Sequence, residues 1–174
     1  EAVMFAKALE AAPDGAAEMF MTAASPGIVA VTMLNRHYAS YEDYVYALAR
    51  EMRKEYRFIV DQGYLLQLDC PDLAMERGRL FAEMSLVGFC NAVALHIDAI
   101  NRAIDGLPPA RVRLHCCWGN WDGPHVDDVP LEEILPLLYE AKVGALSIPF
   151  ANPRHQHEYA VIKKKPPPET MALI

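Results

Sequence analysis

The sequence predicts an α/β fold in which a parallel β-sheet is covered by helices. Three observations support this prediction. Short, nearly continuous apolar runs alternate with longer segments in which apolar residues recur at helical spacing. Strands made of unbroken apolar runs, without apolar–polar alternation, are typical of parallel sheets buried on both faces. Finally, 53% of the 174 residues are hydrophobic and 22% are charged, so the chain can bury a sizeable core.

Five apolar runs are the predicted strands. The first run ends at Pro26-Gly27, a dipeptide that stops a buried strand. The runs are FMTAAS (20–25), YLLQLDCP (64–71), VRLHCCWG (112–119), ALSIPF (145–150) and MALI (171–174), the last of which begins a fifth strand.

Three helices are predicted between these strands. The first begins after Ser40, which resembles a capping box with Asp43. The second covers residues 84–104 and is closed by the turn residues Asp-Gly-Leu-Pro. The third has Pro130 in its first turn, as is favourable at a helix start, and runs to about Ala141.

Composition excludes several classes of function. The formal net charge is −7 and the only basic run is the short KKK at 163–165, so nucleic acid is not an expected partner. No run approaches the roughly 20 apolar residues of a membrane span, and the N-terminal segment has no signal-like pattern, so we expect a cytoplasmic protein. Four cysteines in a chain of this size favour free or metal-bound thiols in a reducing compartment.

Polar side chains follow the predicted strands at the point where each strand ends. Ser25 follows the first strand, Asp69 and Cys70 the second, residues 115–117 the third and residues 152–157 the fourth. In parallel α/β sheets the chemistry lies at the carboxyl ends of the strands. These residues therefore predict a site at one rim of the sheet.

The triplet His115-Cys116-Cys117 is the most unusual of these groups. Along a strand, residues i and i+2 face the same side, so His115 and Cys117 project together and Cys116 points the opposite way. Imidazole and thiolate are ligands that Zn²⁺ prefers, although further ligands must come from elsewhere in the fold. Spacing alone also allows a packed histidine beside two buried thiols, or a vicinal disulfide, which a reducing compartment disfavours.

Four segments together resemble cobalamin-independent methionine synthase, specifically its catalytic domain and its shorter homologues. In chain order they are SPG (25–27), LLQLDCPDLA (65–74), RLHCCWGN (113–120) and ALSIPFANPRHQHEY (145–159). The resemblance implies a partial (β/α)8 TIM barrel that covers about the middle strands. We expect residues 1–174 to form one such domain, truncated at both ends relative to the family, because a full barrel needs roughly 250 residues.

A partial barrel cannot close, and this predicts the assembly. An open sheet leaves at least one strand edge without backbone partners, and such an edge recruits another chain. We therefore expect an obligate homodimer in which two copies pair edge to edge or pack their uncovered sheet faces together.

The resemblance implies a catalytic zinc ion whose first two ligands are His115 and Cys117. The family's next ligand, a Glu, falls near Pro149, which cannot ligate through its side chain, and no cysteine follows Cys117 in this chain. Some thiol-alkylating relatives use a His and two Cys and leave one position open for the substrate. His155 and His157 are alternative ligands if their loop folds back.

The resemblance also implies roles for residues near the zinc. Asp69 would bind the amino group of an amino-acid thiol substrate and act as a catalytic residue; alternatively, it caps the turn before Pro71. Cys70 stands where the family usually has a second acidic residue, which suggests an acceptor thiol other than homocysteine. Ser25 is a further predicted substrate-binding residue.

The segment CWGNW supplies aromatic and polar groups next to the predicted zinc ligands. Trp118 and Asn120 are predicted substrate-binding residues, because an aromatic surface beside a metal stacks a flat ligand such as a pterin. Trp118 or Trp121 serves core packing in the alternative interpretation. Cys90 and His96, on a helix with apolar neighbours, are predicted core residues.

The predicted function is zinc-dependent transfer of a methyl or other alkyl group to a thiol acceptor, a small molecule. In the family the donor is a methylated folate. Zinc lowers the pKa of a bound thiol and so produces a thiolate near neutral pH. The alternatives are a non-catalytic metal-binding or remnant module that keeps the fold, and a cysteine-based redox protein, which would lack the usual CxxC motif.

Overall fold

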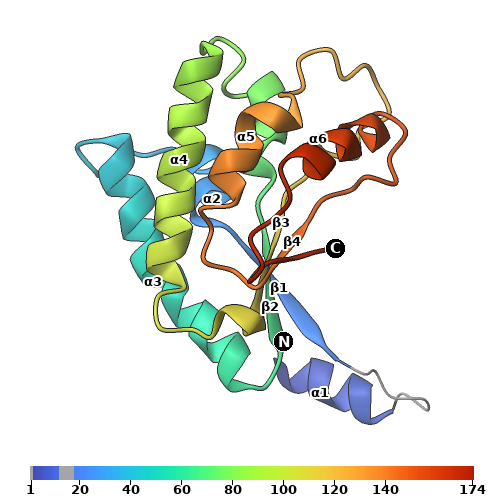
Figure 1. Ribbon diagram of the computed structural model, residues 1–174. Coiled ribbons are helices and arrows are strands. Elements are labelled where there is room, and N and C mark those ends of the chain that lie inside the picture. The colour runs from blue at the N-terminus through green and yellow to red at the C-terminus, as the bar shows by residue number, and fades with distance from the viewer. Residues whose placement is uncertain (1, 12–17) are drawn as a thin grey trace.

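The computed structural model describes residues 2–11 and 18–174, and a five-stranded sheet forms its centre (Figure 1). The strands lie side by side in chain order, and all four pairings are parallel. They are β1 (Phe20–Ala24), β2 (Leu65–Asp69), β3 (Val112–His115), β4 (Ala145–Ser147) and β5 (Ala172–Leu173). The predicted α/β class and the fifth strand are confirmed. A sheet whose strands follow chain order without reversal has the winding of a β/α barrel wall.

Helices flank this sheet. In Figure 1, α2, α3, α4 and α5 cover one face, α6 lies beyond the carboxyl ends of the strands, and α1 lies near their opposite ends. The α-helices are α1 (Ala2–Glu10), α2 (Pro26–Thr32), α3 (Tyr41–Asp61), α4 (Leu86–Ala103), α5 (Leu131–Leu138) and α6 (Tyr159–Lys164). The 3-10 turns are η1 (Pro71–Leu73), η2 (Met75–Gly78), η3 (Pro109–Arg111) and η4 (Gln156–Glu158). None of the helices described here is both long and apolar enough to cross a bilayer.

Side-chain caps explain where the helices begin. The hydroxyl oxygen of Ser40 accepts a hydrogen bond from the Asp43 backbone N–H at 3.0 Å, which confirms the predicted N-cap of α3. Pro26-Gly27 stops β1 as predicted, but it also opens α2, with Ser25 as the N-cap and proline in the first turn. That helix was absent from the prediction because its seven residues are too short for a periodicity signal.

The two faces of the sheet differ. In β2, Leu66 and Leu68 are fully buried, whereas the intervening Gln67 and the terminal Asp69 are half-buried. The β2 residues that face the other side are therefore less covered than those that face the helices. On that face the Arg113 Nε donates to Gln67 Oε1 at 2.7 Å, and the Arg113 guanidinium lies 3.8 Å from the centre of the Phe20 ring.

Candidate functional site

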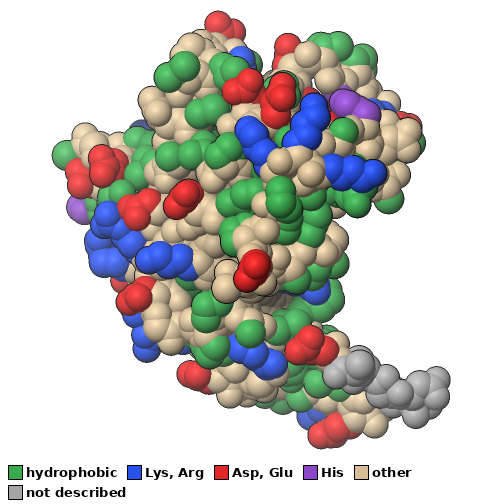
Figure 2. All heavy atoms as spheres, in the orientation of Figure 1, with side chains coloured by type: hydrophobic (Ala, Val, Ile, Leu, Met, Phe, Trp, Pro, Cys, Tyr) green, Lys and Arg blue, Asp and Glu red, His purple; other side chains and the backbone are tan. Residues whose placement is uncertain are grey.

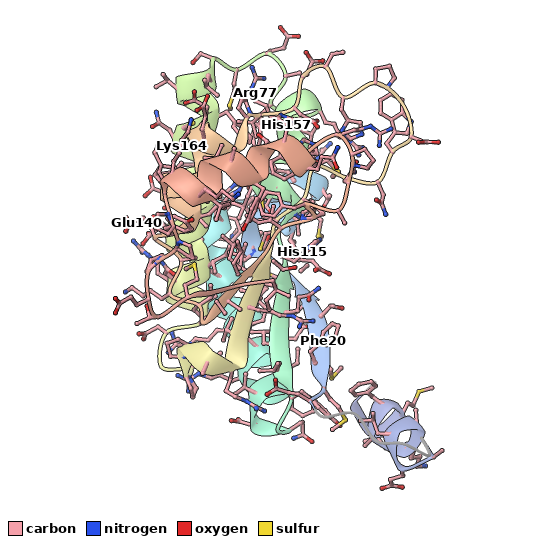
Figure 3. The ribbon with its side chains drawn as sticks, turned by 45° about the vertical axis from the view of Figure 1, so that its right-hand side comes forward. Phe20, Arg77, His115, Glu140, His157 and Lys164 are labelled. Carbon is pink, nitrogen blue, oxygen red and sulfur yellow. The ribbon has the colours of Figure 1, made fainter. Side chains whose placement is uncertain are left out.

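The predicted rim exists at the carboxyl ends of the strands. Strand register places Ala24, Asp69, His115 and Ser147 at one level, each opposite the next. Because directly opposed residues of parallel strands face the same side, Asp69 and His115 share the face that the helices leave uncovered. Figure 3 shows His115 at the end of the sheet nearer α6 and Phe20 toward the other end.

Asp69 is held by a neighbour on its own strand. The Gln67 Nε2 donates to Asp69 Oδ1 at 2.9 Å, and the backbone N–H of Ser25 donates to the Asp69 carbonyl oxygen at 3.2 Å. The alternative role of capping the turn before Pro71 is not observed, because no side-chain hydrogen bond caps η1. The carboxylate of Asp69 is thus oriented at the rim with one oxygen free of any described hydrogen bond.

The predicted alternation along His115, Cys116 and Cys117 is confirmed. Cys116 is completely buried, whereas His115 and Cys117 on either side of it are half-buried. All four cysteines are free thiols, so the vicinal disulfide is not formed. Burial raises the pKa of Cys117, although a hydrogen bond with the Gly119 backbone opposes this, and burial raises the pKa of Cys116 well above its ordinary value.

The donor set at this rim fits half of a zinc site. His115 and Cys117 offer the nitrogen and sulfur that zinc prefers, from one face of the sheet. Within residues 2–11 and 18–174, however, no third histidine, cysteine or carboxylate joins them in a group compact enough for one ion. Pro149, two residues beyond Ser147, adds no side-chain ligand. These residues are therefore candidates for two zinc ligands, not for a complete site.

Ser25 belongs to a buried hydrogen-bonded chain that the sequence did not reveal. Its hydroxyl donates to Asp72 Oδ1 at 2.6 Å and accepts from the Ile28 backbone N–H at 3.0 Å. Asp72 Oδ2 lies 2.9 Å from His96 Nδ1, and His96 Nε2 lies 2.8 Å from the Tyr41 hydroxyl. We call Ser25, Asp72, His96 and Tyr41 the Ser25 network.

One neutral tautomer of His96 satisfies the whole Ser25 network. With a hydrogen on Nδ1 for the Asp72 carboxylate, Nε2 can accept from the Tyr41 hydroxyl. Burial, reinforced by the nearby Asp72, raises the pKa of Tyr41 well above its ordinary value and keeps the phenol a donor. His96 is buried as predicted, yet its ring makes polar contacts with two other segments, at Asp72 and Tyr41. The role of Ser25 in substrate binding stays a prediction, since its hydroxyl already donates one hydrogen bond to Asp72 and accepts one from Ile28.

Trp118 and Asn120 lie at a cavity of about 570 Å³ beside the rim. Trp118 is almost fully buried, and its Nε1 donates to the Val129 carbonyl oxygen at 2.8 Å. The cavity wall consists of residues from η2 and from the loop between β3 and α5: Met75, Gly78, Arg79, Trp118, Gly119, Asn120, Trp121, Pro124, His125, Val126, Asp127 and Asp128. The predicted substrate-binding residues of this segment thus reach a cavity, while Asp69, His115 and Cys117 are not in its wall.

Gly119 packs closely against Met75 in the wall of this cavity. Its φ of +87° is in the region that favours glycine, and a Cβ there would lie 2.8 Å from the Met75 Sδ. A side chain at position 119 would therefore strain the loop and collide with η2.

Two histidines and two carboxylates meet at one side of the cavity. His125 Nδ1 and His155 Nε2 lie 2.8 and 2.9 Å from the same oxygen, Oδ2 of Asp128. The far nitrogens also have partners: His125 Nε2 lies 2.9 Å from the Trp121 carbonyl oxygen, and His155 Nδ1 lies 2.8 Å from Glu158 Oε2. We call His125, Asp128, His155 and Glu158 the loop cluster.

The loop cluster is fixed by the packing around it. The indole of Trp118 stacks on the His155 ring with centroids 4.1 Å apart and planes inclined by 16°. Glu158 uses its second oxygen to accept from the Leu131 backbone N–H at 2.5 Å, at the start of α5. The hydrogen bond to the Trp121 carbonyl raises the pKa of His125, and Asp128 adds to this, while burial opposes it.

The loop that carries His155 therefore folds back, as the sequence allowed. It brings His155 to Asp128 and His125, however, and not into a group with His115 and Cys117. His157, the second alternative ligand, is exposed and does not belong to the group of possible metal ligands found among the described residues. The sequence holds one usable signal for the cluster, since His125 and Asp128, like His155 and Glu158, are three residues apart.

The fold and the rim define an α/β protein with barrel-type winding and polar groups at the strand ends. No family model matches the chain. It is similar to methionine synthases from Saccharolobus islandicus (24% identical, 66% of this chain and 31% of the relative), Thermococcus kodakarensis (24%, 62% and 29%) and Pyrococcus furiosus (27%, 80% and 34%). The chain spans about a third of the length of these curated relatives. The findings support a distant relationship to methionine synthases.

Proposed function

We propose that the protein is part of a methyltransferase of the methionine synthase type, which transfers a methyl or other alkyl group to the sulfur of a small thiol acceptor. The single observation behind this proposal is that Asp69 and His115 are directly opposite each other at the carboxyl ends of β2 and β3, with Cys117 on the same side. The distant similarity to methionine synthases supports it. In this proposal the five strands form part of a (β/α)8 barrel.

In the proposed site, His115 and Cys117 would hold a zinc ion, which lowers the pKa of a bound thiol. Asp69 would bind the amino group of the acceptor, because Gln67 orients its carboxylate and leaves one oxygen available. Trp118, Asn120 and the cavity beside them would receive the flat part of an alkyl donor such as a methylated folate. The free thiols support a reducing, cytoplasmic compartment.

Zinc content and alkyl transfer test this proposal together. We expect zinc-loaded protein to lose about one equivalent of zinc in Cys117→Ala, because one thiolate ligand is removed. Cys90→Ala is the matched control, since Cys90 is half-buried on α4 away from the rim, and it should keep the wild-type zinc content. Unchanged zinc in Cys117→Ala would contradict the proposed site. Methyl transfer from methylfolate to a thiol should fail in the same variant.

A second candidate function is a non-catalytic metal-binding module that keeps this fold. Pro149 favours it, because the position where the family has a Glu ligand offers no donor. Stoichiometric zinc lost in Cys117→Ala, combined with no alkyl transfer to any of a panel of small thiols, would favour the module over the transferase.

We also propose a homodimer. The sheet ends at β1 and β5, and the second face carries exposed residues of β1, including Phe20 at 43% exposure. Unpaired strand edges and an uncovered sheet face recruit another copy. Light scattering at micromolar concentration tests this, and a stable, well-folded monomer would contradict it.

A further inference from the structure

The loop cluster contains a proton conflict that a positive charge must resolve. The Trp121 carbonyl oxygen can only accept, so the His125 Nε2 facing it carries the hydrogen. In a neutral ring the other nitrogen, Nδ1, is then a bare lone pair, and it points at the Asp128 carboxylate oxygen 2.8 Å away. Two acceptors at this separation repel each other unless a proton or a metal ion lies between them.

His155 has the same arrangement. Its Nδ1 faces Glu158 Oε2 at 2.8 Å, and a hydrogen there leaves Nε2 as a lone pair directed at the same Asp128 oxygen, at 2.9 Å. Two imidazole lone pairs and one carboxylate oxygen thus converge, all within 4.8 Å of one another. One divalent cation would satisfy all three groups, whereas protons would have to charge both rings, as imidazolium ions paired with the Asp128 and Glu158 carboxylates.

We propose that His125 Nδ1, Asp128 Oδ2 and His155 Nε2 bind a divalent transition metal of the zinc class. Ligating histidines donate their second ring N–H to a carboxylate or a backbone carbonyl, and here Glu158 and the Trp121 carbonyl occupy these outer positions. Two histidines and one carboxylate are a three-ligand set that leaves one position open. The site is separate from His115 and Cys117 and does not depend on the proposed transferase function.

An ion fits the site after a small shift of the two rings, and it has a route for entry. In a tetrahedral site with metal bonds of about 2.0–2.1 Å, ligand atoms lie about 3.4 Å apart, so each ring must move from Asp128 by about half an ångström. His125 and Asp128 line the 570 Å³ cavity, whereas His155 is 7% exposed behind them. The open position therefore faces the cavity, where it would take water or an oxygen-donor ligand such as a carboxylate.

Cobalt and zinc binding to the full chain test the proposal. We expect His125→Gln and Asp128→Asn each to lose about one equivalent of zinc, measured by elemental analysis after dialysis against zinc chloride. His157→Ala is the matched control, because His157 is an exposed histidine in the segment that carries His155. It should keep the wild-type content. Wild-type zinc content in both His125→Gln and Asp128→Asn would overturn the proposal.

The Cys117→Ala variant separates this site from the proposed zinc site at the rim. Cobalt bound at the loop cluster has only nitrogen and oxygen ligands, so Cys117→Ala should still bind about one equivalent without a thiolate charge-transfer band. Loss of all cobalt in Cys117→Ala would overturn the proposal for the loop cluster. Retention of cobalt together with an unchanged thiolate band would instead contradict the rim site. Circular dichroism checks folding, and His125→Gln decides the result if Asp128→Asn does not fold.

Discussion

The Ser25 network and the loop cluster contain similar residues but have opposite characters. Both place histidine rings against carboxylates at 2.8–2.9 Å. In the Ser25 network one neutral ring satisfies every contact, because Tyr41 donates to His96 Nε2 and Asp72 accepts from Nδ1. In the loop cluster all four ring nitrogens face acceptors, and a neutral pair of rings cannot satisfy them.

Their surroundings differ in the same way. Ser25, Asp72 and His96 are completely buried among α2, η1 and α4, and none of them lines the cavity beside Trp118. His125 and Asp128 border a cavity. A buried hydrogen-bonded chain in which every donor has an acceptor stabilises a fold. A cluster whose neutral rings face only acceptors, and which borders a cavity, is suited to binding a cation. The pairing of donors with acceptors, more than residue type, therefore separates the two roles.

The largest expected effect comes from removing the centre of the Ser25 network. Asp72→Ala leaves the Ser25 hydroxyl and the His96 N–H buried without their acceptor. We expect the free energy of unfolding to fall by about 3–5 kcal/mol, as when one partner of a buried pair is removed. Chemical denaturation measures this. Asp105→Ala is the control, since Asp105 has a 76% exposed side chain, and it should lose no more than about 1 kcal/mol.

A smaller effect is expected at the outer end of the same network. Tyr41→Phe removes the donor to His96 Nε2 and leaves that nitrogen without a partner, which should cost about 1–2 kcal/mol. Tyr46→Phe is the matched control, because it also removes one hydroxyl, whose partner Asp98 is 48% exposed and can turn to water. Equal losses in the two variants would contradict a structural role for the Tyr41 contact.

The smallest expected effect is a pH dependence in the loop cluster of metal-free protein. The pKa of His125 is raised above its ordinary value near 6.5, mainly by the Trp121 carbonyl. Protonation of His125 therefore stabilises the folded protein. This contribution is fully present below about pH 6.5 and is lost as the pH rises through the pKa that His125 has in the folded protein. Unfolding in the presence of a chelator at about pH 6 and pH 8 should show this loss in the wild type and less of it in His125→Gln. An equal loss in both proteins would contradict it. The effect should be smaller than that of Tyr41→Phe.

Some predictions from sequence depended only on local periodicity, and these were correct. The apolar runs gave the five strands, and Ser40 gave the start of α3. The two-residue repeat of a strand placed Cys116 inside and its neighbours half-buried. Strand ends were overestimated, as in the run 112–119, because the apolar residues continue beyond β3 into an irregular segment in which Cys116 and Trp118 are buried.

The chain by itself therefore determined the strands of the sheet and the rim where Asp69 and His115 stand, because apolar runs mark the strands and polar residues mark the points where they end. Only the tertiary structure decided that Asp72 meets His96, 24 residues away, and that Asp128 meets His155, 27 residues away. Asp72, Asp128 and His155 lie in turns and loops, where no periodicity fixes the direction of a side chain. Their meeting depends on how helices and loops pack over the sheet, which brings together residues that no local pattern connects.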